Sequence, residues 1–289
     1  MSLRPPHDQA MTPDRALPHL ITFLSDYGHR DEFVGVCHGV IARRCPSARV
    51  IDLTHGIPRH DVRAGALVLR AALSYLPAGI HLAVVDPGVG ATSEKARRAV
   101  ALRTAEEDRV LVGPDNGLLA LAAERLAGVV EAVDIGESRE RLQPVSRTFH
   151  GRDIFAPVAA ALAAGEELAA VGQPLAAGEL RRLELPSARM VDGALAVHVL
   201  RRDHFGNLSL DASPEQLAAA GAQPGSAMTV QHAGRIHRAR YGTTFADVPG
   251  GELVIYLDAE RMIALAVNHG SAAELLGAGC EDELIVRPR

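Results

Sequence analysis

The feature that most constrains the fold is a regular alternation of short apolar runs with longer helix-like stretches between His19 and Val171. Runs such as LITFLSD, RVIDLTH and IHLAVVD have the length and composition of strands. They alternate with stretches such as VGVCHGVIARRC and DVRAGALVLRAALSYL. Strands that alternate with helices in this way form βαβ units. The pattern therefore predicts an α/β domain with a largely parallel sheet and helices on both faces.

The pattern of apolar runs changes after the connector GQPLAAGELRRLELPSA, which contains several Pro and Gly residues. Short strand-like runs such as ALAVHVL, ELVIYLD and MIALAVN then follow, separated by turn residues. Short strands at regular spacing are typical of barrels and sandwiches, and we expect a smaller C-terminal antiparallel β-barrel. The expected organisation is a flexible leader over residues 1–18, the α/β domain over 19–178 and the barrel over 188–289.

Composition excludes several classes of partner. The 30 Lys and Arg residues are outnumbered by 35 Asp and Glu, and only 3% of the residues are aromatic, so we expect no nucleic-acid partner. No apolar run approaches the length of a membrane helix, so we expect no membrane partner. Cys37, Cys45 and Cys280 are odd in number and scattered, which favours a reducing cytoplasm over a disulfide framework or a cysteine-based zinc site.

Polar residues follow the ends of four strand-like runs in the first domain. They lie in SDYG (Asp26), DPGVG (Asp86), GPDNG (Asp115 and Asn116) and TFHGRD (His150, Arg152 and Asp153). Each has an ordinary local interpretation, because Asp26 suits a helix N-cap and the glycine-rich segments suit tight turns. Together they predict one polar crevice at the carboxyl ends of the strands, where doubly wound folds hold ligands.

The residues in these loops limit which classes of ligand the site can bind. The chain has neither the G-x-G-x-x-G pattern of dinucleotide sites nor the G-x-x-x-x-G-K-[ST] pattern of phosphate loops. Carboxylates without a phosphate loop suit hydroxyl groups, which an Asp can bind in pairs as a ribose diol, or a cation, which it can neutralise. A helix is expected to begin near Ile154 with Asp153 as its N-cap, which leaves His150 free for another task.

Two further clusters lie in the C-terminal domain. In RRDHFGNLSL, Asp203, Phe205 and Asn207 occupy alternate positions. On a strand they would share one face, with a ring beside an amide, as binding of a purine base needs. The plain alternative is a hairpin with a core Phe. In AVNHGSAAELLGAG, Asn268 ends a strand ahead of a helix capped at Ser271, whose backbone amides can serve an adenine edge or the helix alone.

Taken together and in order, the motifs resemble those of one protein family. The chain contains FLSDYG, GVCHGVI, VIDLTHGIPRHDVRAGALVL, HLAVVDPGVG, VGPDNGLL, TFHGRDIFAPVAAAL, DHFGNL and AVNHGSAAELL. In this combination it closely resembles the S-adenosyl-L-methionine (SAM) hydroxide adenosyltransferases, or SAM hydrolases, which are relatives of the fluorinase and chlorinase. The resemblance covers roughly residues 19–289. It implies a SAM-binding catalytic α/β domain, a C-terminal β-barrel and a homotrimer with each active site between neighbouring subunits.

The resemblance also implies the reaction and the residues that perform it. SAM and water give adenosine and L-methionine, so SAM is the substrate, and no cofactor and no metal are expected. The Asp/Arg/His triad of the family falls on Asp86, Arg97 and His150. Arg98 is the alternative arginine, because the link ATSEKARRAV is longer here than is usual in the family.

The substrate-binding residues follow from the same motifs. Asp26 matches the carboxylate that holds the ribose diol. Phe205 and Asn207 match the adenine contacts, and Asp203 is a candidate for the methionine amino group. The candidate substrate-binding set is completed by two residues at strand ends, Asn116 and Asn268.

Two other functions stay open at this stage. A halide-using SAM enzyme shares the fold, but a halide beside Asp86 would be repelled by on the order of 4 kcal/mol at about 4 Å and an effective dielectric constant of about 20. A non-catalytic SAM or adenosine sensor would keep Asp26 and Asn207 without needing the triad.

The implied hydrolysis makes few demands on the catalytic residues. Attack on a sulfonium expels a neutral thioether, so no general acid is needed, and placement of a water molecule is the remaining task.

Overall fold

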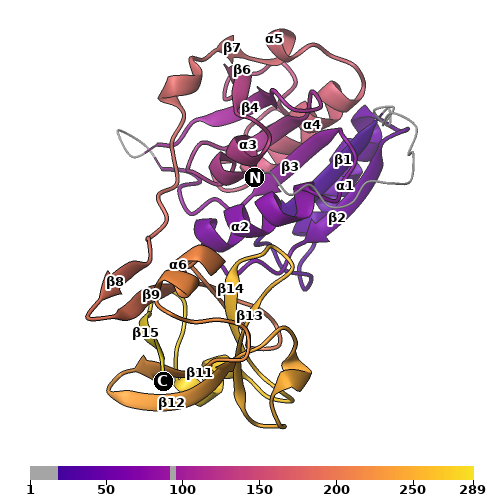
Figure 1. Ribbon diagram of the computed structural model, residues 1–289. Coiled ribbons are helices and arrows are strands. Elements are labelled where there is room, and N and C mark those ends of the chain that lie inside the picture. Colours follow the sequence, from indigo (N-terminus) through magenta and orange to yellow (C-terminus); the bar gives the residue numbers. More distant parts are fainter. Residues whose placement is uncertain (1–18, 92–95) are drawn as a thin grey trace, which may run out of the picture. The chain divides into compact units, whose positions relative to one another are not determined.

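The computed structural model describes residues 19–91 and 96–289 (Figure 1). Its contacts divide the chain into two compact units between Leu183 and Glu184. The N-terminal unit is an α/β domain and the C-terminal unit is a β-barrel, so the predicted fold class is confirmed. The expected leader over residues 1–18 and part of the link ATSEKARRAV lie outside the described residues.

Seven strands form the sheet of the N-terminal unit. Their order across the sheet is β2 (Arg49–Thr54), β1 (Leu20–Ser25), β3 (Ile80–Val84), β5 (Val110–Pro114), β4 (Ala99–Thr104), β6 (Val129–Asp134) and β7 (Gln173–Pro174). β2, β1, β3 and β5 are mutually parallel. For β1, β2 and β3 this follows from the helices that join them. β4 is antiparallel to both β5 and β6, and this reversal lies outside the expected βαβ pattern.

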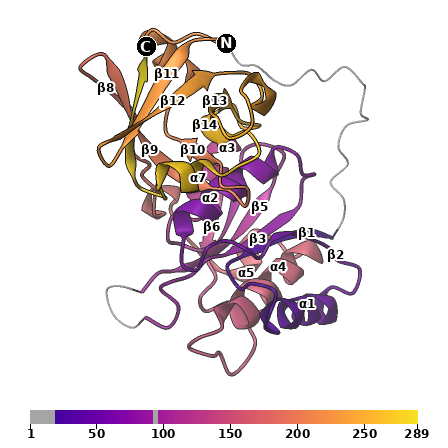
Figure 2. The same ribbon diagram turned by 90° about the horizontal axis from the view of Figure 1, so that it is seen from below.

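Helices cover both faces of this sheet (Figure 2). They are α1 (Phe33–Arg44), α2 (Val62–Leu73), α3 (Ala120–Arg125), α4 (Ala156–Ala163) and α5 (Leu168–Val171). α1, α4 and α5 share one core with Phe23 and Val84, whereas α2 and α3 share the other with Leu24 and Val85. Successive strand residues therefore enter opposite cores, as the pleat of a strand requires. The predicted cover on both faces is confirmed.

The segment before α4 differs from the prediction. A π-helical turn, η1 (Gly151–Phe155), begins directly after His150 and continues into α4. Asp153 is 1% exposed, and its carboxylate accepts the N–H of Ser146 at 2.7 Å and pairs with Arg152. The expected N-cap at Asp153 is wrong, because this carboxylate is used inside the unit to hold the preceding loop.

The C-terminal unit closes into a barrel. Its strands are β8 (Arg189–Val191), β9 (Ala194–Arg202), β10 (Leu208–Leu210), β11 (Ala227–His232), β12 (Arg235–Tyr241), β13 (Leu253–Leu257), β14 (Ile263–Val267) and β15 (Glu283–Pro288). The ring runs β10-β14-β13-β12-β11-β15-β9, and the pairing of β9 with β10 closes it, with β8 outside on β9. β12 and β13 are parallel, which the expected antiparallel barrel did not include. Two short helices, α6 (Pro214–Ala219) and α7 (Ala272–Leu276), complete the unit together with the 3-10 turn η3 (Phe245–Asp247).

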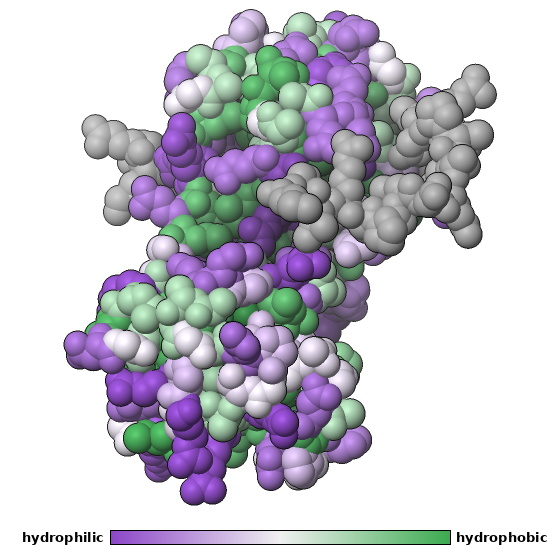
Figure 3. Space-filling view, in the orientation of Figure 1, coloured by the Kyte–Doolittle hydropathy of each residue, from purple (hydrophilic) through white to green (hydrophobic). Residues whose placement is uncertain are grey.

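The helices are short and the surface is mixed. α1 and α2 have 12 residues each, against about 20 for a helix that crosses a bilayer. No helix built from the described residues has the length and apolar composition to span a membrane. On the face drawn in Figure 3, hydrophilic and hydrophobic residues are interspersed on each unit.

We expect Leu111→Ala to lower the free energy of unfolding by about 2–5 kcal/mol, because it leaves a cavity in the sheet's core. Leu111 is fully buried on β5, between β3 and β4. Val130→Ala on β6 is the matched control, since Val130 is 61% exposed, and it should cost less than about 1 kcal/mol. Urea unfolding with hydrogen exchange of the β3 and β5 amides measures both changes. Equal losses would contradict the core described above.

Candidate active site

The carboxyl ends of β1, β3 and β5 meet at one edge of the N-terminal sheet. β3 is buried over its whole length, and the chain turns at Pro87 and Gly88 directly after Asp86. The backbone N–H of Asp26, after β1, donates to the carbonyl of Val84 at 3.4 Å. The structure therefore brings Asp26 and Asp86 to the same edge, where the sequence predicted a polar crevice.

Asp86 is clamped by Arg97. Nε of Arg97 donates to the two carboxylate oxygens at 3.0 and 3.1 Å, and Nη2 donates to Oδ2 as well. Both side chains are only 6% exposed, and the guanidinium lies over the ring of Phe155 at 5.2 Å from its centroid. A buried carboxylate needs such a partner to stay ionised. The clamp therefore fixes both the position and the charge of Asp86.

The same guanidinium contacts His150. Nη2 of Arg97 lies 2.9 Å from Nδ1 of His150. A guanidinium has donors only, so Nδ1 accepts and the proton of the neutral ring is on Nε2. Burial, followed by the positive charge of Arg97, holds the pKa of His150 below its usual value. His150 is thus a neutral imidazole that offers an Nε2–H donor.

Arg98, the alternative arginine, points elsewhere. Its Nη2 donates to Glu179 at 3.2 Å, and its Nη1 is 3.7 Å from the carboxylate of Asp115. Asp115 is buried and also accepts the backbone N–H of Arg181 at 2.8 Å. Of the two arginines that the sequence left open, Arg97 is the one that reaches Asp86.

Asp26 does not cap the helix that follows it. The N-cap position of α1 is Glu32, and Oδ2 of Asp26 instead accepts the backbone N–H of His60 at 2.9 Å. The capping interpretation is wrong, because an intervening loop separates Asp26 from the helix. The carboxylate stays at the edge of the sheet, half-buried.

Tyr27 is also part of this site, although it was not among the residues predicted from the sequence. Its hydroxyl packs so closely on Gly151 that a Cβ at that position would collide with it. Burial raises the pKa of Tyr27 well above its usual value, with smaller contributions from Cys37, Asp86 and Asp26. The phenol therefore stays protonated beside the two carboxylates. Its place next to Asp26 in SDYG was the available signal.

Asn116 is engaged at both ends of its amide. Nδ2 donates to the carbonyl of Val85 at 2.8 Å, and Oδ1 accepts the N–H of Leu118 at 3.1 Å. Gly117 has φ +95°, so the tight turn expected at this glycine-rich segment is confirmed. In this arrangement the Asn116 side chain holds the backbone directly before Asp86.

Asp203, Phe205 and Asn207 lie in the turn between β9 and β10. Oδ1 of Asp203 accepts the N–H groups of Phe205 and Asn207, both at 2.9 Å, and Oδ2 accepts the Asn207 amide at 2.7 Å. The expected shared strand face is wrong, because the Asp203 carboxylate closes a turn in which Gly206 has φ +83°. Phe205 is 74% exposed, which also excludes the alternative of a core Phe.

The structure brings this turn to the start of α7. The carbonyl of Gly206 accepts the N–H of Ala273 at 3.0 Å, and Ser271 caps the helix by accepting the N–H of Glu274 at 3.1 Å, as predicted. Asn268, directly after β14, donates to the carbonyl of Val248 at 2.8 Å. An exposed ring beside a polar turn and a helix start suits a planar base.

These features define a class of protein. The N-terminal unit holds a clamped carboxylate at a strand end and a neutral imidazole directly before a π-helical turn, and the C-terminal unit presents an aromatic ring, so the chain is a two-domain α/β-plus-barrel enzyme. Profiles described as the SAM hydroxide adenosyltransferase N-terminal and C-terminal domains match residues 21–172 and 197–285. The chain belongs to the SAM hydroxide adenosyltransferase family.

Individual relatives agree with this membership. An (R)-S-adenosyl-L-methionine hydrolase of Salinispora tropica is 49% identical over 267 residues, which are 92% of this chain and 97% of the relative. A fluorinase of Nocardia brasiliensis is 29% identical over 289 residues, with 91% and 95% of the two chains covered. A crystal structure of a conserved protein from Thermotoga maritima superposes with a TM-score of 0.83 at 35% identity, covering 92% of this chain and 99% of that one.

We expect the imidazole of His150 to titrate below its usual pKa of about 6.5 and to be neutral at neutral pH. Arg97→Gln should raise this pKa, because it removes a cation that disfavours the imidazolium and leaves the Asp86 carboxylate to favour it. Histidine NMR spectra recorded from acid to neutral pH measure both values. A His150 pKa at or above about 6.5 in the unchanged protein would refute the acceptor role of Nδ1.

Proposed function

We propose that this protein hydrolyses SAM to adenosine and L-methionine. The observation that carries the proposal is that one guanidinium, that of the buried Arg97 side chain, contacts both Asp86 and His150. Similarity to the Salinispora tropica enzyme named (R)-S-adenosyl-L-methionine hydrolase supports the same reaction.

In this reaction the leaving group departs without being protonated. The oxygen of a water molecule forms a bond with C5′ of SAM, the C5′–S bond breaks, and its electron pair stays on sulfur. The sulfonium becomes a neutral thioether, so it needs no proton. The water must lose one proton, and it must be held in line with the breaking bond.

Each member of the cluster has a role in this step. Asp86 orients the attacking water and accepts its proton, because a carboxylate oxygen that receives one hydrogen bond from Arg97 can still accept another. Arg97 holds the carboxylate in place. His150 offers its Nε2–H to the water oxygen, which fixes a lone pair toward C5′. The proton taken up by Asp86 returns to bulk water when the products leave.

The substrate contacts are proposed from both units. Asp26 binds the ribose diol, and Phe205 stacks on adenine while Asn207 and Asn268 contact its edge. Asp203 takes the methionine amino group, since a carboxylate can accept about four hydrogen bonds and three are already used. Asn116 acts by holding the loop of the reacting carboxylate.

A homotrimer with shared sites follows from the family resemblance, and we include it in the proposal. The reacting residues belong to one unit and the adenine residues to the other, so a ring of three subunits can pair the first unit of one chain with the second unit of its neighbour. We also place the protein in the cytoplasm, because Cys37, Cys45 and Cys280 are all free thiols. SAM remains the substrate, and no cofactor, nucleic acid or membrane takes part.

Asp86→Asn should lower kcat for SAM hydrolysis by about 10²–10⁴-fold, because the amide keeps the shape but cannot take the proton. Affinity for SAM should change little. The assay uses ¹⁸O-labelled water and mass spectrometry, and the label is expected in the 5′-hydroxyl of adenosine and not in methionine. Thermal unfolding of the variant checks that it is folded.

Arg97→Lys and Arg98→Lys form the matched pair for this assay. Only the first removes a contact to Asp86, so only the first should lose activity. Unchanged turnover in Asp86→Asn would demote this carboxylate to a turn residue, and SAM binding without any methionine release would leave a sensor as the function.

A halide-using reaction is the second candidate, because fluorinases are among the relatives. Asp86 repels an anion, although Arg97 offsets part of that repulsion. Product analysis in the presence of chloride and fluoride separates the two reactions. Adenosine as the sole nucleoside supports hydrolysis, whereas a 5′-halo-adenosine supports the second candidate.

Mixing Asp86→Asn and Asn207→Ala chains should restore about a quarter of the original turnover at equal amounts, since each shared site draws one half at random from either chain. Each variant alone should be nearly inactive. Native mass spectrometry verifies that subunits exchange. If exchange occurs and activity does not return, the whole site lies within one chain.

A further inference from the structure

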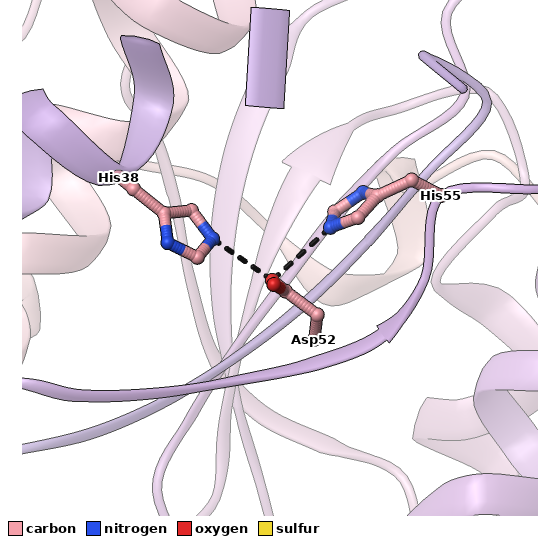
Figure 4. A group of neighbouring side chains, drawn as sticks. All are labelled: His38, Asp52 and His55. Carbon is pink, nitrogen blue, oxygen red and sulfur yellow. Dashed lines mark hydrogen bonds and ion pairs between the residues drawn. The ribbon is translucent and has the colours of Figure 1, made fainter. Parts of the chain in front are cut away.

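A second cluster of possible ligands lies in the N-terminal unit, apart from the residues assigned to the reaction. His38 comes from α1, Asp52 from the edge strand β2 and His55 from the segment after β2, and their side chains point toward one another (Figure 4). Nε2 of His38 and Nε2 of His55 lie 2.9 Å and 3.0 Å from the same Asp52 oxygen. The ligand atoms all lie within 4.8 Å of one another.

We propose that His38, Asp52 and His55 bind one divalent transition-metal ion, with Zn²⁺ as its representative. Two imidazoles and a carboxylate are a donor set that zinc and its first-row neighbours prefer. Zinc bonds of about 2.0–2.2 Å place tetrahedral ligand atoms roughly 3.3 Å apart, so the two short separations need to open only slightly. A water molecule completes the coordination.

His55 provides the independent observation. Its side chain is fully buried, and its Nε2 makes no hydrogen bond within the described part of the chain, although a carboxylate oxygen is 3.0 Å away. The other ring nitrogen, Nδ1, is 2.7 Å from Oγ of Ser25, and the ring packs edge-on against Phe23. A buried nitrogen whose nearest acceptor makes no hydrogen bond with it is costly, whereas a metal ion would satisfy it. The Ser25 contact is the outer-shell hydrogen bond that metal-bound histidines keep.

The position of the cluster indicates a structural role. The N–H of Gly28 donates to the carbonyl of His55 at 2.7 Å, and the N–H of Tyr27 donates to Oγ of Ser25 at 3.3 Å. A metal ion at His55 would therefore brace α1, β2 and the loop after β1. This role does not depend on the hydrolysis proposed above.

The experiment titrates Zn²⁺ into tag-free, EDTA-treated full-length protein by calorimetry. We expect one Zn²⁺ per chain and a higher melting temperature, and no effect of Mg²⁺, which prefers oxygen ligands. Co²⁺ should give the visible absorption of nitrogen and oxygen coordination. His38→Gln and Asp52→Asn change partly exposed side chains, so both variants should fold. Loss of an outer-shell partner typically lowers metal affinity by about 10–100-fold, and each of these variants should lower the affinity for Zn²⁺ by more than that, because each removes a direct ligand.

His198→Gln is the matched control. His198 contacts Asp211 at 2.8 Å and Glu283 at 3.5 Å, but through opposite ring nitrogens, so the three groups share no common point. This variant should bind Zn²⁺ like the unchanged protein. Binding that survives both His38→Gln and Asp52→Asn, or no binding at micromolar Zn²⁺, would overturn the proposal and leave a purely hydrogen-bonded cluster.

Discussion

The parallel pairing of β3 between β1 and β5 is the constraint on which the site depends. Parallel strands end at the same edge of a sheet, so residues far apart in the sequence meet there without any side-chain contact having to draw them together. The contacts of Asp26 with Val84 and of Asn116 with Val85 extend this alignment one step beyond the strands. The position of Asp86 is therefore a property of the backbone, which explains how the proposed reacting carboxylate can lie on a loop and still be well placed.

At this edge, Arg97 determines how Asp86 and His150 are held and charged. One guanidinium pairs with a buried carboxylate and occupies Nδ1 of His150, so it balances the charge of Asp86 and, together with burial, lowers the pKa of the imidazole. A lysine could carry the charge but not both directed contacts, because its ammonium lacks the planar fork. The cluster is thus a unit, because one guanidinium holds both of its other members in place.

Much of the fold was predictable, because apolar alternation and turn residues are local signals. The two domains, the helices on both faces and the capped start of α7 all follow from them. The site was less accessible where tertiary contacts override local preference. Asp153 looks like a cap but is buried against Arg152, and 203–207 looks like a strand but is closed by the Asp203 carboxylate. Arg97 and Arg98 lie directly before β4, and which of them reaches Asp86 depends on the side of the chain on which each side chain lies. No spacing in the sequence determines that.

The loop after β1 connects two clusters of different character. Ser25 and Gly28 contact His55 on one side, while Asp26 and Tyr27 face the carboxylate edge on the other. Asp86 and Arg97 are attached to β3 and β4 instead, so they do not share this loop. Stiffening at His55 therefore acts first on Asp26, the proposed ribose ligand, and reaches Asp86, the proposed reacting carboxylate, through Tyr27 and through strand pairing. Because these two carboxylates follow different strands, the loop after β1 is the segment through which a change at His55 reaches both.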